Sequence, residues 1–204
     1  MGLTIDNFKN MISLALQNIK AREDEFSKLD AIAGDGDHGT AIVTAMEVIN
    51  AEAQKGTEFA TMLNDMGMEV MMQISGSTST LLGALFMGMG EAVKGTELDA
   101  AQVKAMFEGG LKGVKEQTKA MPGDKTMMDA LVPAVEAIAA CPAEEIGVVL
   151  QAGAEAALKG AEATTGMQAK FGRARNLGER SIGYPDAGAT SWSCLIASMA
   201  DGLK

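Results

Sequence analysis

The sequence predicts an all-α protein, and three observations lead to that prediction. Alanine, leucine, methionine, glutamate and lysine dominate the composition, and all of them favour helices. Apolar residues recur at helical spacing along most of the chain. Runs of β-branched residues are rare, so no strand of convincing length is expected. The chain has 204 residues, 47% of them apolar, which is enough for one domain with a sizeable core over residues 1–204.

Helical periodicity, capping residues and prolines set the predicted elements. Thr4 and Asp99 stand where N-caps are expected, directly before periodic segments. Residues 81–93 are apolar almost all round, which predicts a helix at the centre of the domain. In chain order, the predicted helices cover residues 5–19, a short stretch around Phe26 and Leu29, then 40–53, 58–74, 81–93, 99–118, a helix containing Pro133, 143–164 and 191–203.

Residues 166–190 show little periodicity and are predicted to form a long loop. The stretch is rich in glycine and holds Arg173, Arg175 and Arg180, three of the four arginines of the chain. A loop of this length in a compact helical domain is usually functional or disordered, and its mixed charged and apolar content favours an ordered, functional loop. Arginines gathered in one place of an acidic protein indicate an anion-binding site, with ion pairs to helix carboxylates as the alternative.

The composition also argues against several classes of function. A formal net charge of −10 argues against nucleic acid or an anionic membrane as the main partner. Cys141 and Cys194 show neither metal-ligand spacing nor a disulfide framework, so a cytoplasmic location is expected. The N-terminal residues lack the parts of a secretion signal, and the apolar stretch 81–89 is too short to span a bilayer.

The most informative segment is residues 30–39, DAIAGDGDHG. Asp30, Asp35 and Asp37 fall within eight positions, interleaved with glycines, and the only histidine, His38, follows them. Like charges this close repel each other, and a hard divalent cation is the obvious counter-charge. Because alternate residues of an extended segment point the same way, Asp35 and Asp37 can face one ligand. The segment therefore predicts a magnesium site, with aspartates that cap helices at an exposed turn as the alternative.

Two other interpretations of this segment fit poorly. Residues 34–39 match the dinucleotide pattern G-x-G-x-x-G, but a helix rather than a strand leads into them, and two aspartates would face a pyrophosphate. An EF-hand loop counted from Asp35 would place Gly39 and Met46 at ligand positions. There is no Walker A sequence either, because an aspartate separates glycine from lysine in residues 123–125.

Small hydroxyl residues at positions 77–80 stand at the predicted start of a helix, where free backbone N–H groups attract an anion. Ordinary helix capping explains them as well. His38 either contacts phosphate or is a surface residue beside acids, and Asp124 is more often a helix cap than a ligand. Together, acids for a metal, hydroxyls and amides for phosphate, and arginines for charge neutralisation are the parts of a phosphoryl-transfer site.

The chain resembles the nucleotide-binding, DhaL-type subunit of dihydroxyacetone kinase. Three stretches carry the resemblance, LDAIAGDGDHG, PGDKTMMDALVP and GRARNLGERSIGYPDAGATS, and the spacing agrees along nearly the whole chain. The resemblance implies a barrel-like bundle of eight antiparallel amphipathic helices, with the nucleotide bound in the loops at one end. The chain departs from the family at residues 75–79, usually Gly-Gly-Ala-Ser-Gly, and at Tyr184 and Ala187, usually histidine and proline.

The resemblance also assigns site residues. Asp30, Asp35 and Asp37 match the aspartates that hold two magnesium ions on the diphosphate of ADP or ATP. Together with Arg173, expected to stabilise the leaving side, they form the predicted catalytic set. The predicted nucleotide contacts are His38, Gly39, Thr40, Ala41, Thr78, Ser79, Thr118 (in place of a family glycine), Met127, Arg173, Asp186, Ala187 and Gly188.

The function implied by the resemblance is that of a kinase subunit. A separate ketone-binding subunit would hold a short ketose through a histidine, and this chain would deliver the phosphoryl group. Dihydroxyacetone is the expected ketose, and a tetrulose such as erythrulose is the alternative. Bound ADP would be recharged by a phosphoryl-carrier protein or free ATP would be used. A different class of function is a nucleotide-loaded regulatory module that binds a transcription factor through the same face.

Overall fold

A computed structural model describes residues 2–203 of the chain, and helices dominate it, as predicted. The only strands among these residues are β1 (Leu3–Thr4) and β2 (Glu97–Leu98), which pair antiparallel. A strand of two residues is too short to show a periodic pattern, so the sequence could not predict β1 and β2. The helices are α1 (Ile5–Ala21), α2 (Glu23–Ala31), α3 (His38–Lys55), α4 (Phe59–Gln73), α5 (Ser77–Ala92), α6 (Ala100–Gln117), α7 (Met128–Ala140), α8 (Ile146–Ala163), α9 (Ala187–Asp201) and the 3₁₀ segments η1 (Thr164–Gly166) and η2 (Arg173–Ser181).

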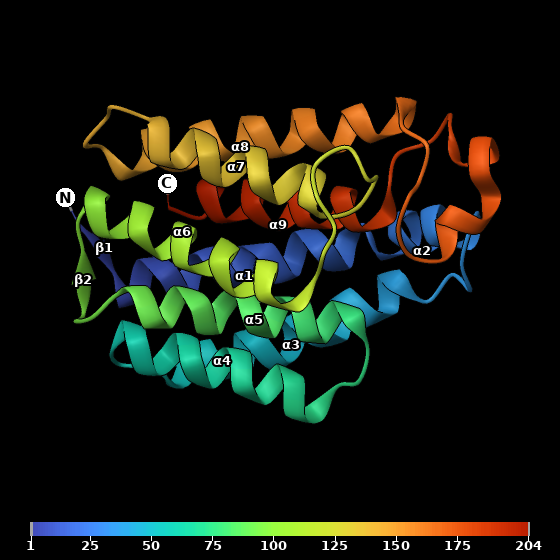
Figure 1. The fold of residues 1–204 in the computed structure, drawn as a ribbon. Coiled ribbons are helices and arrows are strands. Elements are labelled where there is room, and N and C mark those ends of the chain that lie inside the picture. The colour runs from blue at the N-terminus through green and yellow to red at the C-terminus, as the bar shows by residue number, and fades with distance from the viewer. Residues whose placement is uncertain (1, 204) are drawn as a thin grey trace.

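The long helices form a closed ring. In the order α1, α3, α4, α5, α6, α7, α8 and α9, each packs against the next, and α9 returns to α1. Neighbours in the ring run antiparallel, and the short α2 packs against α3 and α9 (Figure 1). The barrel-like bundle that the resemblance implied is confirmed. α9 is more completely buried than α5, so the helix expected at the centre is not the most enclosed one.

Apolar side chains fill the interior between the helices. Phe8 of α1 meets Phe59 of α4 edge to face, with 5.7 Å between ring centroids, and Trp192 of α9 is almost fully buried. A side chain at Gly109 would clash with the backbone oxygen of Gly88, so α5 and α6 pack closely only because glycine stands there. Among the described residues, no helix is long and apolar enough to cross a membrane.

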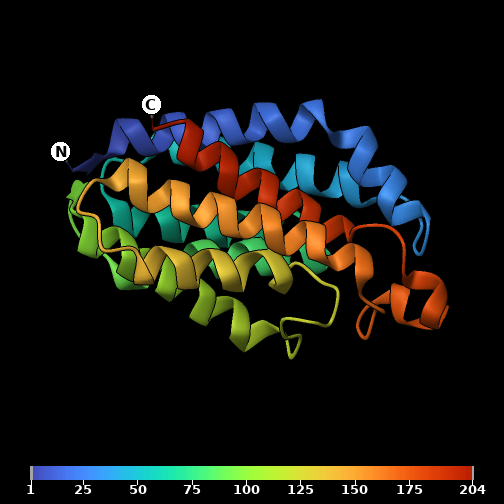
Figure 2. The same ribbon diagram turned by 90° about the horizontal axis from the view of Figure 1, so that it is seen from above.

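The chain reverses alternately at two opposite ends of the bundle. One end carries the α2–α3, α4–α5, α6–α7 and α8–α9 connections, and η2 projects there beyond the helices (Figure 2). α5 and α9 each begin four residues earlier than predicted, because the small residues before their apolar runs already have helical geometry. Part of the predicted loop 166–190 is η2. All of these differences lie at the end with the long loops.

Candidate functional site

A cavity of about 330 Å³ opens among the four connections at this end of the bundle. Its volume is in the range of small-molecule sites. Residues from the α2–α3 bend, the start of α5, the α6–α7 loop, η2 and the start of α9 line it. Segments far apart in the sequence therefore meet at one site, as the resemblance implied.

The acidic bend between α2 and α3 brings three carboxylates together. One oxygen each of Asp30, Asp35 and Asp37 lies within 4.8 Å of the others. The Gly36 N–H donates to Asp30 Oδ2 at 2.9 Å, and Gly36 has a φ of +78°, a conformation that suits glycine. A cluster of carboxylate oxygens with few other ligands fits a hard cation such as Mg²⁺.

Arg173 supplies a counter-charge to this bend. Its guanidinium pairs with Asp35, and this hydrogen bond lowers the pKa of the Asp35 carboxyl and raises that of Arg173. Both side chains are largely exposed, so the pair adds little stability. The contact nevertheless places the first arginine of η2 beside the acidic bend, in the cavity that the start of α5 also lines.

His38, the first residue of α3, is half-buried. Its Nε2 lies 2.8 Å from Ser191 Oγ of α9. Burial lowers the pKa of His38, and the charges of Asp30 and Asp37 oppose that shift. The imidazole lines the cavity and joins α3 to α9.

The start of α5 offers free backbone donors. Gly76 has a φ of +121° and no side chain caps the helix, so the first N–H groups of α5 lack a partner within it. Ser77 and Thr78 line the cavity. The Ser79 hydroxyl does not, because it is buried and donates to the carbonyls of Ile74 at 2.7 Å and Gly76 at 3.0 Å. In this structure the Ser79 hydroxyl is therefore engaged with the backbone that leads into α5.

The α6–α7 loop is shaped by two buried charges that sequence reasoning did not single out. The Asp129 carboxylate accepts from the Thr126 N–H at 2.8 Å and from the Gly123 N–H. The Lys125 ammonium is also buried and lines the cavity beside Met127. Asp124 does not cap α7 but accepts from the Met121 N–H at 2.9 Å. The only sequence signal for Lys125 and Asp129 was their place in the stretch PGDKTMMDALVP, which carries part of the family resemblance.

Asp186 caps α9 at the inner wall of the cavity. Its carboxylate accepts from the Ala189 N–H at 2.7 Å. Burial raises the pKa of Asp186 to about 6, although this hydrogen bond and the charge of Lys125 oppose the rise. Ala187 and Gly188 follow it along the cavity wall.

The cavity wall includes most of the predicted site residues. Asp30, Asp35, Asp37, His38, Thr78, Met127, Arg173, Asp186, Ala187 and Gly188 line it, whereas Gly39, Thr40, Ala41, Ser79 and Thr118 do not. Gly39 packs against the Glu23 carbonyl, Thr40 donates to Glu23 at 2.9 Å, and the Thr118 hydroxyl accepts from the Ala120 N–H at 3.1 Å. These contacts lie around the cavity and not in its wall.

Comparisons with known proteins identify the family. The family model described as DAK2 domain matches residues 32–201. The chain belongs to the DAK2 domain family. Within this family, it is 35% identical over 211 residues to the PEP-dependent dihydroxyacetone kinase, ADP-binding subunit DhaL, of Escherichia coli, and the match covers both chains completely. The DhaL-type resemblance is thereby confirmed.

Other DAK2 relatives are longer proteins. The D-erythrulose kinase of Mycolicibacterium smegmatis is 34% identical over 186 residues, which cover 88% of this chain and 32% of that one. The dihydroxyacetone kinase from C. freundii, solved in complex with AMP-PNP and Mg²⁺, matches with a TM-score of 0.71 at 26% identity, over 95% of this chain and 33% of that chain. This DAK2 domain thus spans about a third of the length of these relatives.

Proposed function

We propose that this chain is the Mg²⁺–nucleotide-binding subunit of a kinase for a short ketose. The cluster of Asp30, Asp35 and Asp37 oxygens within 4.8 Å, at the mouth of a cavity lined by free helix N–H groups and an arginine, carries the proposal. The E. coli relative named as an ADP-binding subunit and the C. freundii kinase solved with AMP-PNP and Mg²⁺ support it.

Each group has a role that follows from its chemistry. The three aspartates would hold Mg²⁺, two ions by the family resemblance, and the bound metal would neutralise charge on the phosphates. The free N–H groups of α5 and the Thr78 hydroxyl would receive phosphate oxygens. Arg173 would pair with phosphate oxygens from the opposite side. Met127 and residues 186–188 would enclose the base.

A separate subunit would hold and activate the acceptor. His38, the only histidine, is engaged with Ser191, so the chain offers no free imidazole as a base for an acceptor hydroxyl. Most of the exposed large apolar side chains lie at the cavity end: Ile32, Met68, Met71, Met72, Met121 and Ile182. Among the described residues, no carboxylate pairs with the exposed Arg175 or Arg180. Such an apolar and cationic rim suits a transient partner.

The acceptor would be dihydroxyacetone or a related ketose. The name of the E. coli DhaL relative supports dihydroxyacetone, and the name of the M. smegmatis D-erythrulose kinase supports erythrulose as a second candidate. In the phosphotransferase mode, a phosphoryl-carrier protein would recharge bound ADP, as the name PEP-dependent suggests for the E. coli relative.

Two measurements test the proposal together. Calorimetry should show that the purified chain binds ADP in the presence of Mg²⁺ and much more weakly in EDTA. Ketose phosphorylation should appear only when a ketone-binding subunit is added to the charged chain. Binding that ignores the metal would contradict the proposed metal site, and full turnover by the chain alone would contradict the need for a partner.

A further inference from the structure

Lys125 is an unusual charged residue of the α6–α7 loop. Its side chain is only 2% exposed, and no carboxylate of the described residues lies within ion-pair distance of its ammonium. Among residues 2–203 it is also the only non-glycine residue with a positive φ, +61°. Burial of an ammonium and a left-handed backbone both oppose folding. The contacts of this ammonium must therefore offset both.

Those contacts leave no donor for a ligand. Lys125 Nζ donates to the Thr164 carbonyl at 2.8 Å and to the Tyr184 carbonyl at 2.6 Å. It also lies 4.7 Å from the centroid of the Tyr184 ring, within cation–π range. Two carbonyls and one ring face account for the three N–H bonds of an ammonium. Lys125 therefore does not act as a direct ligand of the nucleotide, although it lines the cavity.

The two carbonyls belong to the two ends of one loop. Thr164 follows α8 and Tyr184 precedes α9, and residues 165–183 between them carry Arg173 and the rest of η2. Near the same point, the Gly183 N–H donates to the Thr165 carbonyl at 2.8 Å and the Asp186 N–H donates to Thr164 Oγ1 at 2.9 Å. Lys125 thus joins the base of this loop to the α6–α7 loop.

We propose that Lys125 is a positioning residue whose ammonium clamps the base of loop 165–183 and so fixes Arg173 in the cavity that the start of α5 also lines. Charge-assisted bonds are about twice as strong as neutral ones, so two of them constrain a long loop better than the neutral backbone bond beside them. The clamp itself is independent of the ligand, and its effect on nucleotide rests on the proposed function.

Hydrogen exchange of the free protein tests the clamp directly. Lys125→Met keeps an unbranched side chain, one heavy atom shorter, and the same backbone strain but removes the ammonium. Amides of residues 167–183 should exchange about tenfold faster or more, because the change removes two charge-assisted bonds and one alone is worth about that much, while α1 and α5 amides keep their rates. Unchanged exchange in the loop, or faster exchange spread evenly over all helices, would overturn the proposal.

Lys170→Met is the matched control. Lys170 Nζ also joins the same loops, since it donates to the Gly123 carbonyl at 2.9 Å, but its side chain is 63% exposed. Its removal should change loop exchange less than about threefold, because exposed polar contacts contribute little. An effect equal to that of Lys125→Met would show that any tie between the loops suffices and would refute the special role of the buried ammonium.

Nucleotide dissociation provides the second readout. In stopped-flow experiments with Mg²⁺ and a fluorescent ADP analogue, Lys125→Met should release the analogue about tenfold faster, and Lys170→Met should release it at the wild-type rate. An unchanged release rate in Lys125→Met would show that the clamp does not affect nucleotide binding and would overturn that part of the proposal. If wild type itself does not bind the analogue, the proposed function fails, while the exchange result still decides the clamp.

Tyr184→Leu keeps the test decisive if Lys125→Met does not fold. This change removes the ring under the ammonium but leaves both carbonyl bonds, and Tyr184 is only half-buried. It also removes the bond that the Tyr184 hydroxyl donates to the Arg180 carbonyl at 3.2 Å, so the reference is Tyr184→Phe, which loses that bond and keeps the ring. Loop exchange should quicken about two- to fivefold, in line with a weak cation–π contact. No acceleration confined to residues 167–183 would then count against the proposal.

Discussion

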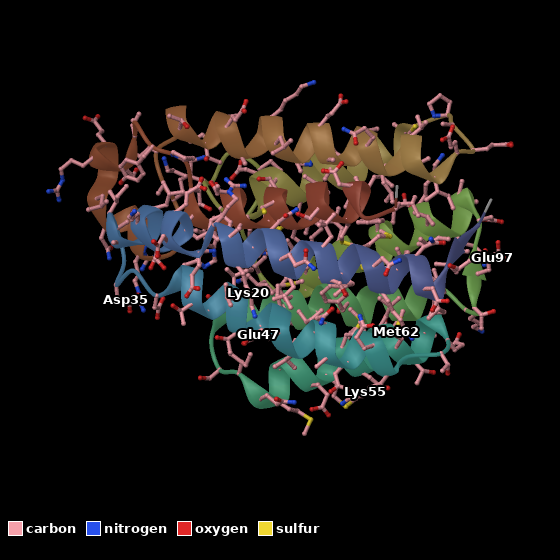
Figure 3. The ribbon with its side chains drawn as sticks, turned by 180° about the vertical axis from the view of Figure 1, so that it is seen from behind. Lys20, Asp35, Glu47, Lys55, Met62 and Glu97 are labelled. Atoms are coloured by element: carbon pink, nitrogen blue, oxygen red, sulfur yellow. The ribbon has the colours of Figure 1, made fainter. Side chains whose placement is uncertain are left out.

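Helices that begin at the two ends of the bundle differ in how their N-termini are capped. Figure 3 places Asp35 at one end and Glu97 at the opposite end. At the Glu97 end, α1, α4 and α6 begin with side-chain caps, and β1 pairs with β2. At the Asp35 end, α3, α5 and α7 begin without a capping side chain. The capped α9 and the uncapped α8 depart from this pattern.

This difference in capping assigns stability mainly to the Glu97 end and ligand binding to the Asp35 end. Caps at the Glu97 end satisfy helix donors locally, so they stabilise the fold and leave nothing for a ligand. At the Asp35 end, donors stay free at α5, Lys125 and Asp129 are buried, and Asp186 has a raised pKa. Changes at the Asp35 end should therefore alter binding or pH dependence, and changes at the Glu97 end should alter stability alone.

The largest effect is expected from Asp37→Asn. Asp30 accepts a hydrogen bond from the Gly36 N–H within the bend, and Asp35 pairs with Arg173. Replacing Asp37 therefore disturbs the fewest contacts other than those to a bound metal. Affinity for Mg²⁺–ADP should fall at least about 100-fold, or about 3 kcal/mol, as for the loss of one member of a close charge pair.

Calorimetry and circular dichroism check this prediction together. The helical signal of Asp37→Asn should match wild type, because the side chain is exposed. Asp65→Asn on α4 is the control, since it removes the same charge from an exposed site away from the cavity. Wild-type affinity in Asp37→Asn would refute the metal role of the acidic bend.

The second effect is a pH dependence of stability at Asp186. Because burial raises its pKa to about 6, the folded state holds the proton at higher pH than the unfolded state, whose ordinary value is 3.8. The resulting penalty is full above pH 6 and disappears as the pH falls toward 4. Lys125 reduces this penalty and Asp129 increases it.

Urea unfolding of wild type and Asp186→Asn isolates this group. From pH 7 to pH 4.5, wild type should gain about 2 kcal/mol of stability relative to the variant. The difference between the two proteins is needed because the pKa of His38 is lowered, which makes the stability of both proteins fall in acid. A constant difference across this range would show that Asp186 is ionised normally.

The third effect concerns the proposed partner and uses the exposed apolar rim. Ile182→Asp or Ile32→Asp should weaken association with a ketone-binding subunit about tenfold or more, because a charge replaces an apolar contact. Val148→Asp at the start of α8, at the opposite end of the bundle, is a close match, since Val148 is 46% exposed and Ile182 is 45% exposed. Surface plasmon resonance should show normal binding for Val148→Asp, and equal losses in all three variants would contradict a contact at the cavity end.

The features that the sequence predicts are those that depend on residues close together in the chain. Thr4 and Asp99 act through neighbouring residues, and both were predicted as caps and are confirmed as capping boxes. The three aspartates were predictable because they are adjacent in the chain. Lys125 was not, because its partners, Thr164 and Tyr184, are distant in sequence. Likewise, nothing in the run of hydroxyls at 77–80 indicated that Ser79 would turn inward.

The smallest effect should appear at the Glu97 end, with Asp99→Ala. The Asp99 carboxylate accepts from the Gln102 N–H at 2.8 Å, and the Gln102 side chain returns a bond to the Asp99 N–H. Its loss should lower stability by about 1 kcal/mol and leave Mg²⁺–ADP affinity unchanged. Thr78→Val at the start of α5 should do the reverse, because this hydroxyl lines the cavity and caps nothing. Thermal unfolding measures the stability of both variants, and calorimetry measures their affinity for Mg²⁺–ADP. A loss of affinity in Asp99→Ala would show that the two ends are coupled through the bundle.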